Sequence, residues 1–152
     1  MDLVLWRHAQ AHVEPVGDDM ARCLTAKGQR QADRMAVWLN QRLPDKARIL
    51  VSPAQRTQQT AQALGRSFET LDALAPQASV DDLLRAAKWP DGHETVLLVG
   101  HQPTLGLLAA RLMTGQDLPW SLRKGAVWWY RGRVLGGELD VMLQAVQAPD
   151  FL

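Results

Sequence analysis

Short apolar runs that alternate with helix-like segments are the feature that most constrains how this chain can fold. The runs are too short for helices and are predicted to be buried strands; they lie at residues 3–6, 49–51 and 94–99. The intervening segments carry apolar side chains at helical spacing or helix-start residues; they lie at about 26–42, 53–65, 80–88 and from 103 onward. This alternation predicts an α/β fold of three layers, in which a mainly parallel sheet is flanked by helices.

Two helix starts and the end of the chain add detail to this fold. Thr25 is a predicted N-cap, and Ser52 is predicted to cap the next helix with Pro53 in its first turn. A brief strand is expected at 70–71. Residues 126–130 and 139–143 are predicted to form a hairpin, because leucine and valine recur at every second position of the latter. Proline and glycine are not gathered into a linker, so we expect a single domain over residues 1–152.

Charge and cysteine content exclude several classes of protein. The 17 Lys and Arg residues are balanced by 16 Asp and Glu residues, and this net charge of +1 argues against a nucleic-acid partner. No apolar run approaches the about 20 residues that span a membrane, and the N-terminus does not resemble a signal peptide. Cys23 is the only cysteine, so no disulfide framework exists within the chain. We expect a cytoplasmic, monomeric protein without a membrane partner.

Polar side chains follow three of the predicted strands. Arg7 and His8 come directly after the first strand, and His101 follows the strand that ends at 99. Arg56 lies in the first turn of the helix after the second strand. The carboxyl ends of parallel strands meet at one edge of a sheet, where ligands bind. We therefore predict a site for a tetrahedral dianion, most simply phosphate, because that edge brings together two arginines, two histidines and the N-termini of two helices.

Four motifs give this pattern a family resemblance. In chain order they are LWRHA at 5–9, LTAKG at 24–28, VSPAQRT at 51–57 and VGHQP at 99–103. Together they resemble the histidine phosphatase superfamily, which has the phosphoglycerate mutase-like fold. The short chain and its Arg-His-Ala start are most similar to the small SixA-type phosphohistidine phosphatases, and the resemblance covers about residues 2–145.

The resemblance implies a role for each matching residue. His8 is implied to be the nucleophile, which forms a phosphohistidine intermediate that water then hydrolyses; a neutral imidazole can do this near pH 7. Arg7, Arg56 and His101 are implied to bind the phosphoryl oxygens and to stabilise the transition state, with Gln102 as a further phosphate contact. No metal or other cofactor is required.

The general acid of larger family members has no clear counterpart. Ala73 stands where a glutamate is expected, so the candidates are Asp72 beside it and, in the loop after His8, Glu14, Asp18 and Asp19. An imidazole leaving group needs less protonation than an alkoxide, so a weak acid favours an N–P substrate. The stretch 76–94 allows only a small cap. We therefore predict a phosphatase for phosphohistidine on a signalling or phosphotransfer protein.

Two other functions remain open at this point, and two other chemistries are disfavoured. The alternatives are a small-molecule phosphomonoesterase of the same superfamily and a phosphate-binding module without catalysis. A zinc site at His8 and His12 lacks the glutamate and the helix of the zincin motif. Cys23 lacks the Cys-x5-Arg spacing of a cysteine phosphatase and is expected to be a buried small side chain.

Overall fold

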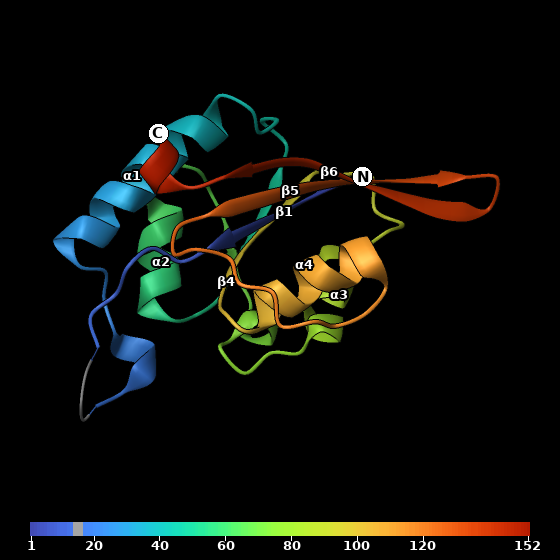
Figure 1. Cartoon of the computed structure of the whole chain (residues 1–152). Helices are drawn as coiled ribbons and strands as arrows, with labels where there is room; N and C mark the ends of the chain where they lie inside the picture. Colours follow the sequence, from blue (N-terminus) through green and yellow to red (C-terminus); the bar gives the residue numbers. More distant parts are fainter. Residues whose placement is uncertain (14–16) are drawn as a thin grey trace.

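A six-stranded sheet with helices on both faces forms the body of the computed structural model, which describes residues 1–13 and 17–152 (Figure 1). The strands are β1 (Asp2–Arg7), β2 (Arg48–Val51), β3 (Glu69–Thr70), β4 (Val96–Gly100), β5 (Val127–Leu135) and β6 (Glu138–Gln147). Their order in the sheet is β3-β2-β4-β1-β5-β6. β1, β2, β3 and β4 pair in parallel, whereas β5 pairs antiparallel with both β1 and β6. The predicted α/β fold, with its terminal hairpin, is confirmed.

Alternating side chains of β1 explain the three layers. Leu3 and Leu5 face one side of the sheet and are fully buried against α3 (Val80–Ala87) and α4 (Thr104–Thr114). Val4 and Trp6 face the other side and are fully buried against α1 (Ala26–Asn40), with α2 (Gln55–Gln62) completing that layer. A strand buried on both faces has to be apolar throughout, which is why the run at 3–6 could be recognised in the sequence.

The two predicted helix caps have different outcomes. Thr25 caps α1 as predicted, since its hydroxyl accepts a hydrogen bond from the Gly28 backbone N–H at 3.0 Å. Ser52 does not cap α2, which begins only at Gln55 with Ala54 in the N-cap position. The prediction for Ser52 was wrong because its hydroxyl contacts the ring of His101, 2.7 Å away, and accepts from the Ala54 N–H. A tertiary contact thus replaces the local cap.

The carboxyl ends of β1, β2 and β4 lie in register at one edge of the sheet. Arg7 pairs with Gly100, and Val51 pairs with Val99. The pairing continues one residue further, because His8 N–H donates to the Gly100 carbonyl and Ser52 N–H donates to the Val99 carbonyl, both at 3.1 Å. The chain beyond each strand end is therefore fixed by backbone hydrogen bonds. In the described parts of the chain, no helix is both long and apolar enough to cross a membrane.

Candidate active site

The two histidines predicted for the site lie together at this edge. His8 follows β1 and His101 follows β4, and their ring centroids are 5.4 Å apart with the ring planes inclined by 54°. Both side chains are buried, with 7% of His8 and 4% of His101 exposed. Residues 93 positions apart in the chain are thus neighbours because their strands are adjacent and parallel.

The hydrogen bond of His8 sets its tautomer. Its Nδ1 lies 2.7 Å from the carbonyl oxygen of Ala9. A carbonyl can only accept, so the hydrogen of the neutral ring is on Nδ1 and the lone pair is on Nε2. Burial and, to a smaller extent, the nearby arginines lower the pKa of His8 to about 4, and the hydrogen bond to Ala9 opposes this only in part. A neutral imidazole with its Nε2 lone pair free is the form that can act as a nucleophile.

His101 is held through its other nitrogen. Its Nε2 lies 2.7 Å from Ser52 Oγ, whereas its buried Nδ1 has no partner within the described structure. Burial first, and then the positive charge of Arg56, lower the pKa of His101 to about 3. His101 is therefore neutral in the free protein. A bound dianion would oppose both effects and favour a hydrogen or a positive charge on this ring.

The two predicted arginines enter the site from different elements. Arg56 lies in the first turn of α2 and is 4% exposed, and Arg7 is the last residue of β1. Arg7 Nη1 donates to the Leu122 carbonyl at 2.8 Å. In both side chains Nε is buried without a hydrogen-bond partner among the described residues. These guanidinium groups therefore keep donor capacity that a phosphoryl oxygen would satisfy.

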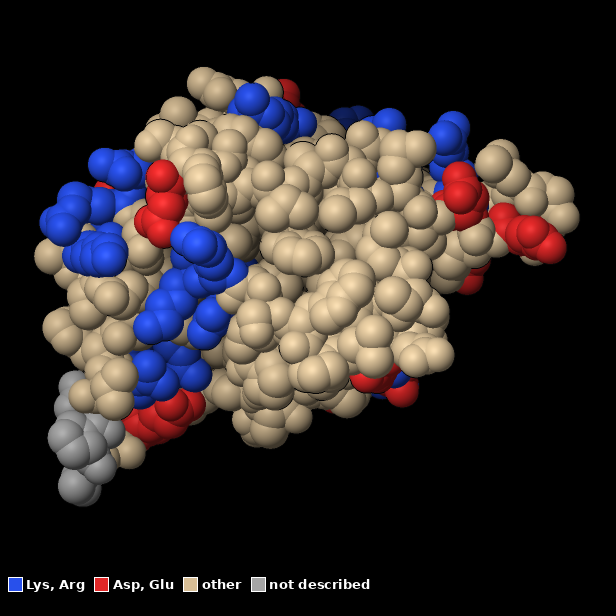
Figure 2. All heavy atoms as spheres, in the orientation of Figure 1, with Lys and Arg blue, Asp and Glu red and all other residues tan. Residues whose placement is uncertain are grey.

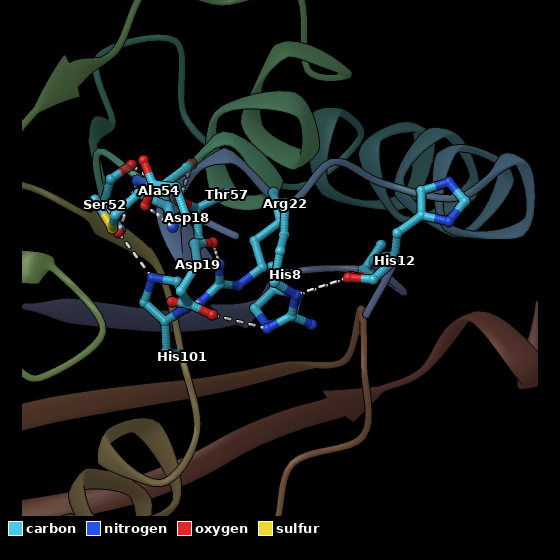
Figure 3. A network of polar contacts seen from close by, with 12 residues as sticks. His8, His12, Asp18, Asp19, Arg22, Ser52, Ala54, Thr57 and His101 are labelled. Atoms are coloured by element: carbon cyan, nitrogen blue, oxygen red, sulfur yellow. Dashed lines mark hydrogen bonds and ion pairs between the residues drawn. The ribbon is translucent and has the colours of Figure 1, made fainter. Parts of the chain in front are cut away.

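Arg56 is also bound by Asp19, in the one-turn helix η1 (Asp19–Ala21). Its Nη1 donates to the Asp19 carbonyl at 2.8 Å and its Nη2 to the Asp19 carboxylate at 3.1 Å. The same carboxylate accepts from Arg22 Nη1 at 3.0 Å, and Arg22 Nε donates to the His12 carbonyl at 2.7 Å (Figure 3). Hydrogen bonds from Arg22 and Arg56 lower the pKa of Asp19, so this carboxylate is ionised. Sequence reasoning missed Arg22, because nothing in the sequence between β1 and α1 indicates which loop residues fold back over a strand end.

The other predicted acids are not joined to these residues. Asp72 is exposed at the start of η2 (Asp72–Leu74), and no hydrogen bond or ion pair of the described residues links it to the two histidines. Asp18 is exposed and accepts from the Met20 N–H, which makes it the cap of η1. Glu14 lies outside the described residues. Of the three candidates that the structure describes, Asp19 is the one that contacts a predicted phosphate-binding residue.

Three further predictions can be compared with the geometry. The Gln102 side chain donates one hydrogen of Nε2 to the Trp120 carbonyl at 3.0 Å, so one amide hydrogen is left for another acceptor, and the phosphate contact stays a prediction. Cys23 is exposed, so the prediction of a buried side chain was wrong; it lies in the loop before α1, where the chain runs over the surface. His12 is exposed and points away from His8 (Figure 3), an arrangement that would not bring both to one metal ion.

Two arginines and two neutral histidines thus meet at the carboxyl edge of a mainly parallel sheet, an arrangement that can bind a phosphoryl group. The chain belongs to the histidine phosphatase superfamily, because the family model of branch 1 matches residues 3–78 and curated relatives match most of the chain. It is accordingly a phosphatase.

Two of the curated relatives are named as phosphohistidine phosphatases or as a homolog of one. SixA of Escherichia coli K12 is 33% identical over 128 residues, which cover 78% of this chain and 78% of SixA. The SixA homolog of Haemophilus influenzae is 34% identical over 128 residues, with 74% of this chain and 77% of the homolog covered. A structure of protein histidine phosphatase SixA complexed with tungstate superposes with a TM-score of 0.82 at 28% identity and covers 99% of both chains. The chain is thus similar to SixA along its whole length.

Proposed function

We propose that this phosphatase hydrolyses phosphohistidine on a signalling or phosphotransfer protein, and that His8 is its nucleophile. The observation that carries the proposal is the state of His8: a buried neutral ring with hydrogen on Nδ1 and a free Nε2, beside two guanidinium groups and His101. The similarity to relatives that are named phosphohistidine phosphatases supports the same substrate class.

The reaction would proceed in two displacements at phosphorus. Nε2 of His8 attacks, the new P–N bond forms, and the P–N bond of the substrate breaks with its electron pair on the leaving imidazole. Water then attacks the phosphorus of phosphorylated His8, which releases phosphate and restores the neutral ring. Arg7, Arg56 and His101 would bind the phosphoryl oxygens, whose negative charge the transition state spreads over the equatorial positions. If Ser52 donates to His101 Nε2, the hydrogen on Nδ1 is available to the phosphoryl group.

In the part of the chain that the structure describes, no hydrogen bond or ion pair joins a carboxylate to His8, and this favours an N–P substrate. Among the described residues, the carboxylate closest in contact with the site is Asp19, and two arginines keep it ionised near neutral pH. An ionised carboxylate cannot protonate an alkoxide. A leaving imidazole has a pKa near neutrality and can take its proton from water or arrive already protonated. The same site is therefore better suited to phosphohistidine than to an alkyl phosphate.

The segment between β3 and β4 packs largely against the sheet. η2 and α3 in this segment bury Leu74, Val80 and Leu83 in the core beneath the sheet, so these elements belong to the helical layer. A side chain on a folded partner can reach His8 only if no large cap covers the pocket. This supports a protein-borne phosphohistidine over a small phosphate ester. The cytoplasmic location and the monomeric state stay predictions from the sequence.

The proposal is tested by comparing kcat/KM for a histidine-phosphorylated phosphotransfer protein with values for a panel of sugar phosphates. We expect faster turnover of the phosphohistidine protein, and acid-labile 32P on wild-type enzyme quenched during turnover. The His8→Ala variant should lose both while its circular dichroism spectrum stays unchanged. Faster turnover of an alkyl phosphate would identify a phosphomonoesterase, and phosphate binding without turnover would identify a binding module; either result contradicts the proposal.

A further inference from the structure

The loop between α4 and β5 forms one wall of the site and connects it to the C-terminal end of the chain. The Leu122 carbonyl accepts from Arg7, and the Gly125 N–H donates to the His8 carbonyl at 3.0 Å. Gly125 is also packed against the C-terminal turn η3 (Pro149–Phe151), because a Cβ at this position would lie 2.9 Å from Cγ of Pro149. Gly125 therefore contacts both the backbone of His8, the predicted nucleophile, and the C-terminal turn, so the surface around that turn lies next to the candidate site.

An apolar hollow of about 510 Å³ opens on this surface, between the loop, β6 and η3. We call it the docking hollow; Trp128, Val146, Ala148 and Phe151 supply its apolar walls and Arg123 lies on its margin. Phe151 is 74% exposed and Val146 is 50% exposed. Large apolar side chains gathered around a concave surface are typical of a binding site for another macromolecule.

We infer that the docking hollow receives a folded protein whose phosphohistidine enters the His8 pocket, an inference that rests on the proposed function. A stable interface covers roughly 800 Å² on each partner, a patch about 30 Å across. One loop separates the hollow from His8, as the contacts of Gly125 show. A folded partner centred on His8 would therefore cover the hollow, whereas a free amino acid or a sugar phosphate would not extend to it.

The charges around the hollow indicate the chemistry of the partner. The guanidinium of Arg123 lies 5.8 Å from the centre of the Phe151 ring and 3.1 Å from the carboxylate of Asp150, and the next residue, Lys124, is exposed. On the same face a column of Lys and Arg side chains borders a broad uncharged surface (Figure 2). A partner surface that complements the docking hollow would have an apolar side chain for the hollow and acidic residues around it for the basic side chains. Such charges at the rim of an interface mainly steer the encounter of the two proteins.

Two variants and one matched control test the inference. Phe151→Asp and Val146→Asp each place a carboxylate at the docking hollow. Val134→Asp places one on an apolar residue whose exposure, 58%, lies between those of Val146 and Phe151; it is near the turn of the β5–β6 hairpin, which projects from the body of the molecule (Figure 1). Each variant is assayed on a histidine-phosphorylated phosphotransfer protein and on free phosphohistidine, which has the same leaving group.

For the protein substrate we expect both hollow variants to lower kcat/KM about tenfold or more, mainly through KM. Free phosphohistidine should be turned over at the wild-type rate, and Val134→Asp should change neither.

Three outcomes would overturn the inference. Unchanged turnover of the protein substrate in both hollow variants means that nothing docks there. Equal losses on the two substrates mean that these residues shape the pocket and do not dock a partner. A wild-type dimer in sedimentation that Phe151→Asp dissociates, with unchanged turnover of the protein substrate, means that a second copy covers the hollow. Failure of the proposed function is distinct, because the wild-type enzyme would then turn over neither phosphohistidine substrate.

Discussion

Acidification tests the charge state of the two site histidines, because each has a lower pKa in the folded chain than in the unfolded chain. An unfolded histidine titrates near 6.5, whereas the pKa is about 4 for His8 and about 3 for His101. Below 6.5 the unfolded chain therefore binds protons that the folded chain does not. The stabilisation is complete above that pH and is lost as the pH falls toward the folded pKa values.

The magnitude follows from these values. Between about pH 8 and pH 5 the unfolded imidazole becomes almost fully protonated, while His8 stays about 90% neutral in the folded chain. Each histidine then contributes about 2 kcal/mol to the loss of unfolding free energy over this interval. Urea denaturation at the two pH values measures the loss. The variant His8→Gln removes one titrating group, so its loss should be smaller than that of the wild type by about 2 kcal/mol.

Nuclear magnetic resonance of the imidazole nitrogens provides a second measurement on the folded protein. We expect the hydrogen of His8 on Nδ1, as the contact with the Ala9 carbonyl requires, and a ring that is still mostly neutral at about pH 5. The reasoning is refuted if His8→Gln and the wild type lose the same free energy, or if His8 has its hydrogen on Nε2.

Three other predictions concern the contacts around the site. Arg56→Ala should lower kcat/KM by about 100-fold or more, because it removes a charged donor from the transition state; Arg56→Lys should restore only part of this, since an ammonium lacks the planar fork. Asp19→Asn should raise KM for the phosphoprotein several-fold with a smaller change in kcat, because it removes the carboxylate that aligns Arg56 and Arg22; an unchanged KM would show that Arg56 needs no such support. Gly106→Ala should destabilise the fold by about 2 kcal/mol or more in urea denaturation, because the new Cβ would lie 1.7 Å from the Trp120 carbonyl oxygen; wild-type stability would contradict this.

The parts of the site that could be predicted are those whose positions depend on a strand end or a helix start. Arg7, His8 and His101 directly follow or end buried strands, and apolar runs locate such strands in a sequence. Arg56 follows from the helix after β2, although that helix begins two residues later than expected. Once the strands are taken as parallel neighbours, topology alone brings these residues to one edge. Their roles in catalysis stay predictions until the variants are measured.

The parts that could not be predicted depend on contacts between distant segments. The hydroxyl of Ser52 has the sequence context of a helix cap, but His101, 49 positions away, lies within hydrogen-bond distance of it. The loop that contains Asp19 and Arg22 has no periodic pattern, so nothing in it indicates that it folds back onto Arg56. Exposure of Cys23 is missed for a related reason, because burial of a small side chain depends on which surface the loop crosses.

The site carries more positive charge than the formal net charge of the whole chain suggests. Arg7, Arg56 and Arg22 contribute three positive charges, the ionised Asp19 contributes one negative charge, and both site histidines are neutral in the free protein. Three minus one leaves +2 for these four described side chains, in a chain whose formal net charge is +1. A phosphoryl group carries about two negative charges near neutral pH. The charge of these side chains matches a single phosphoryl dianion, and Asp19 contributes to the match in two ways: it offsets one positive charge and it holds Arg56 and Arg22 in place.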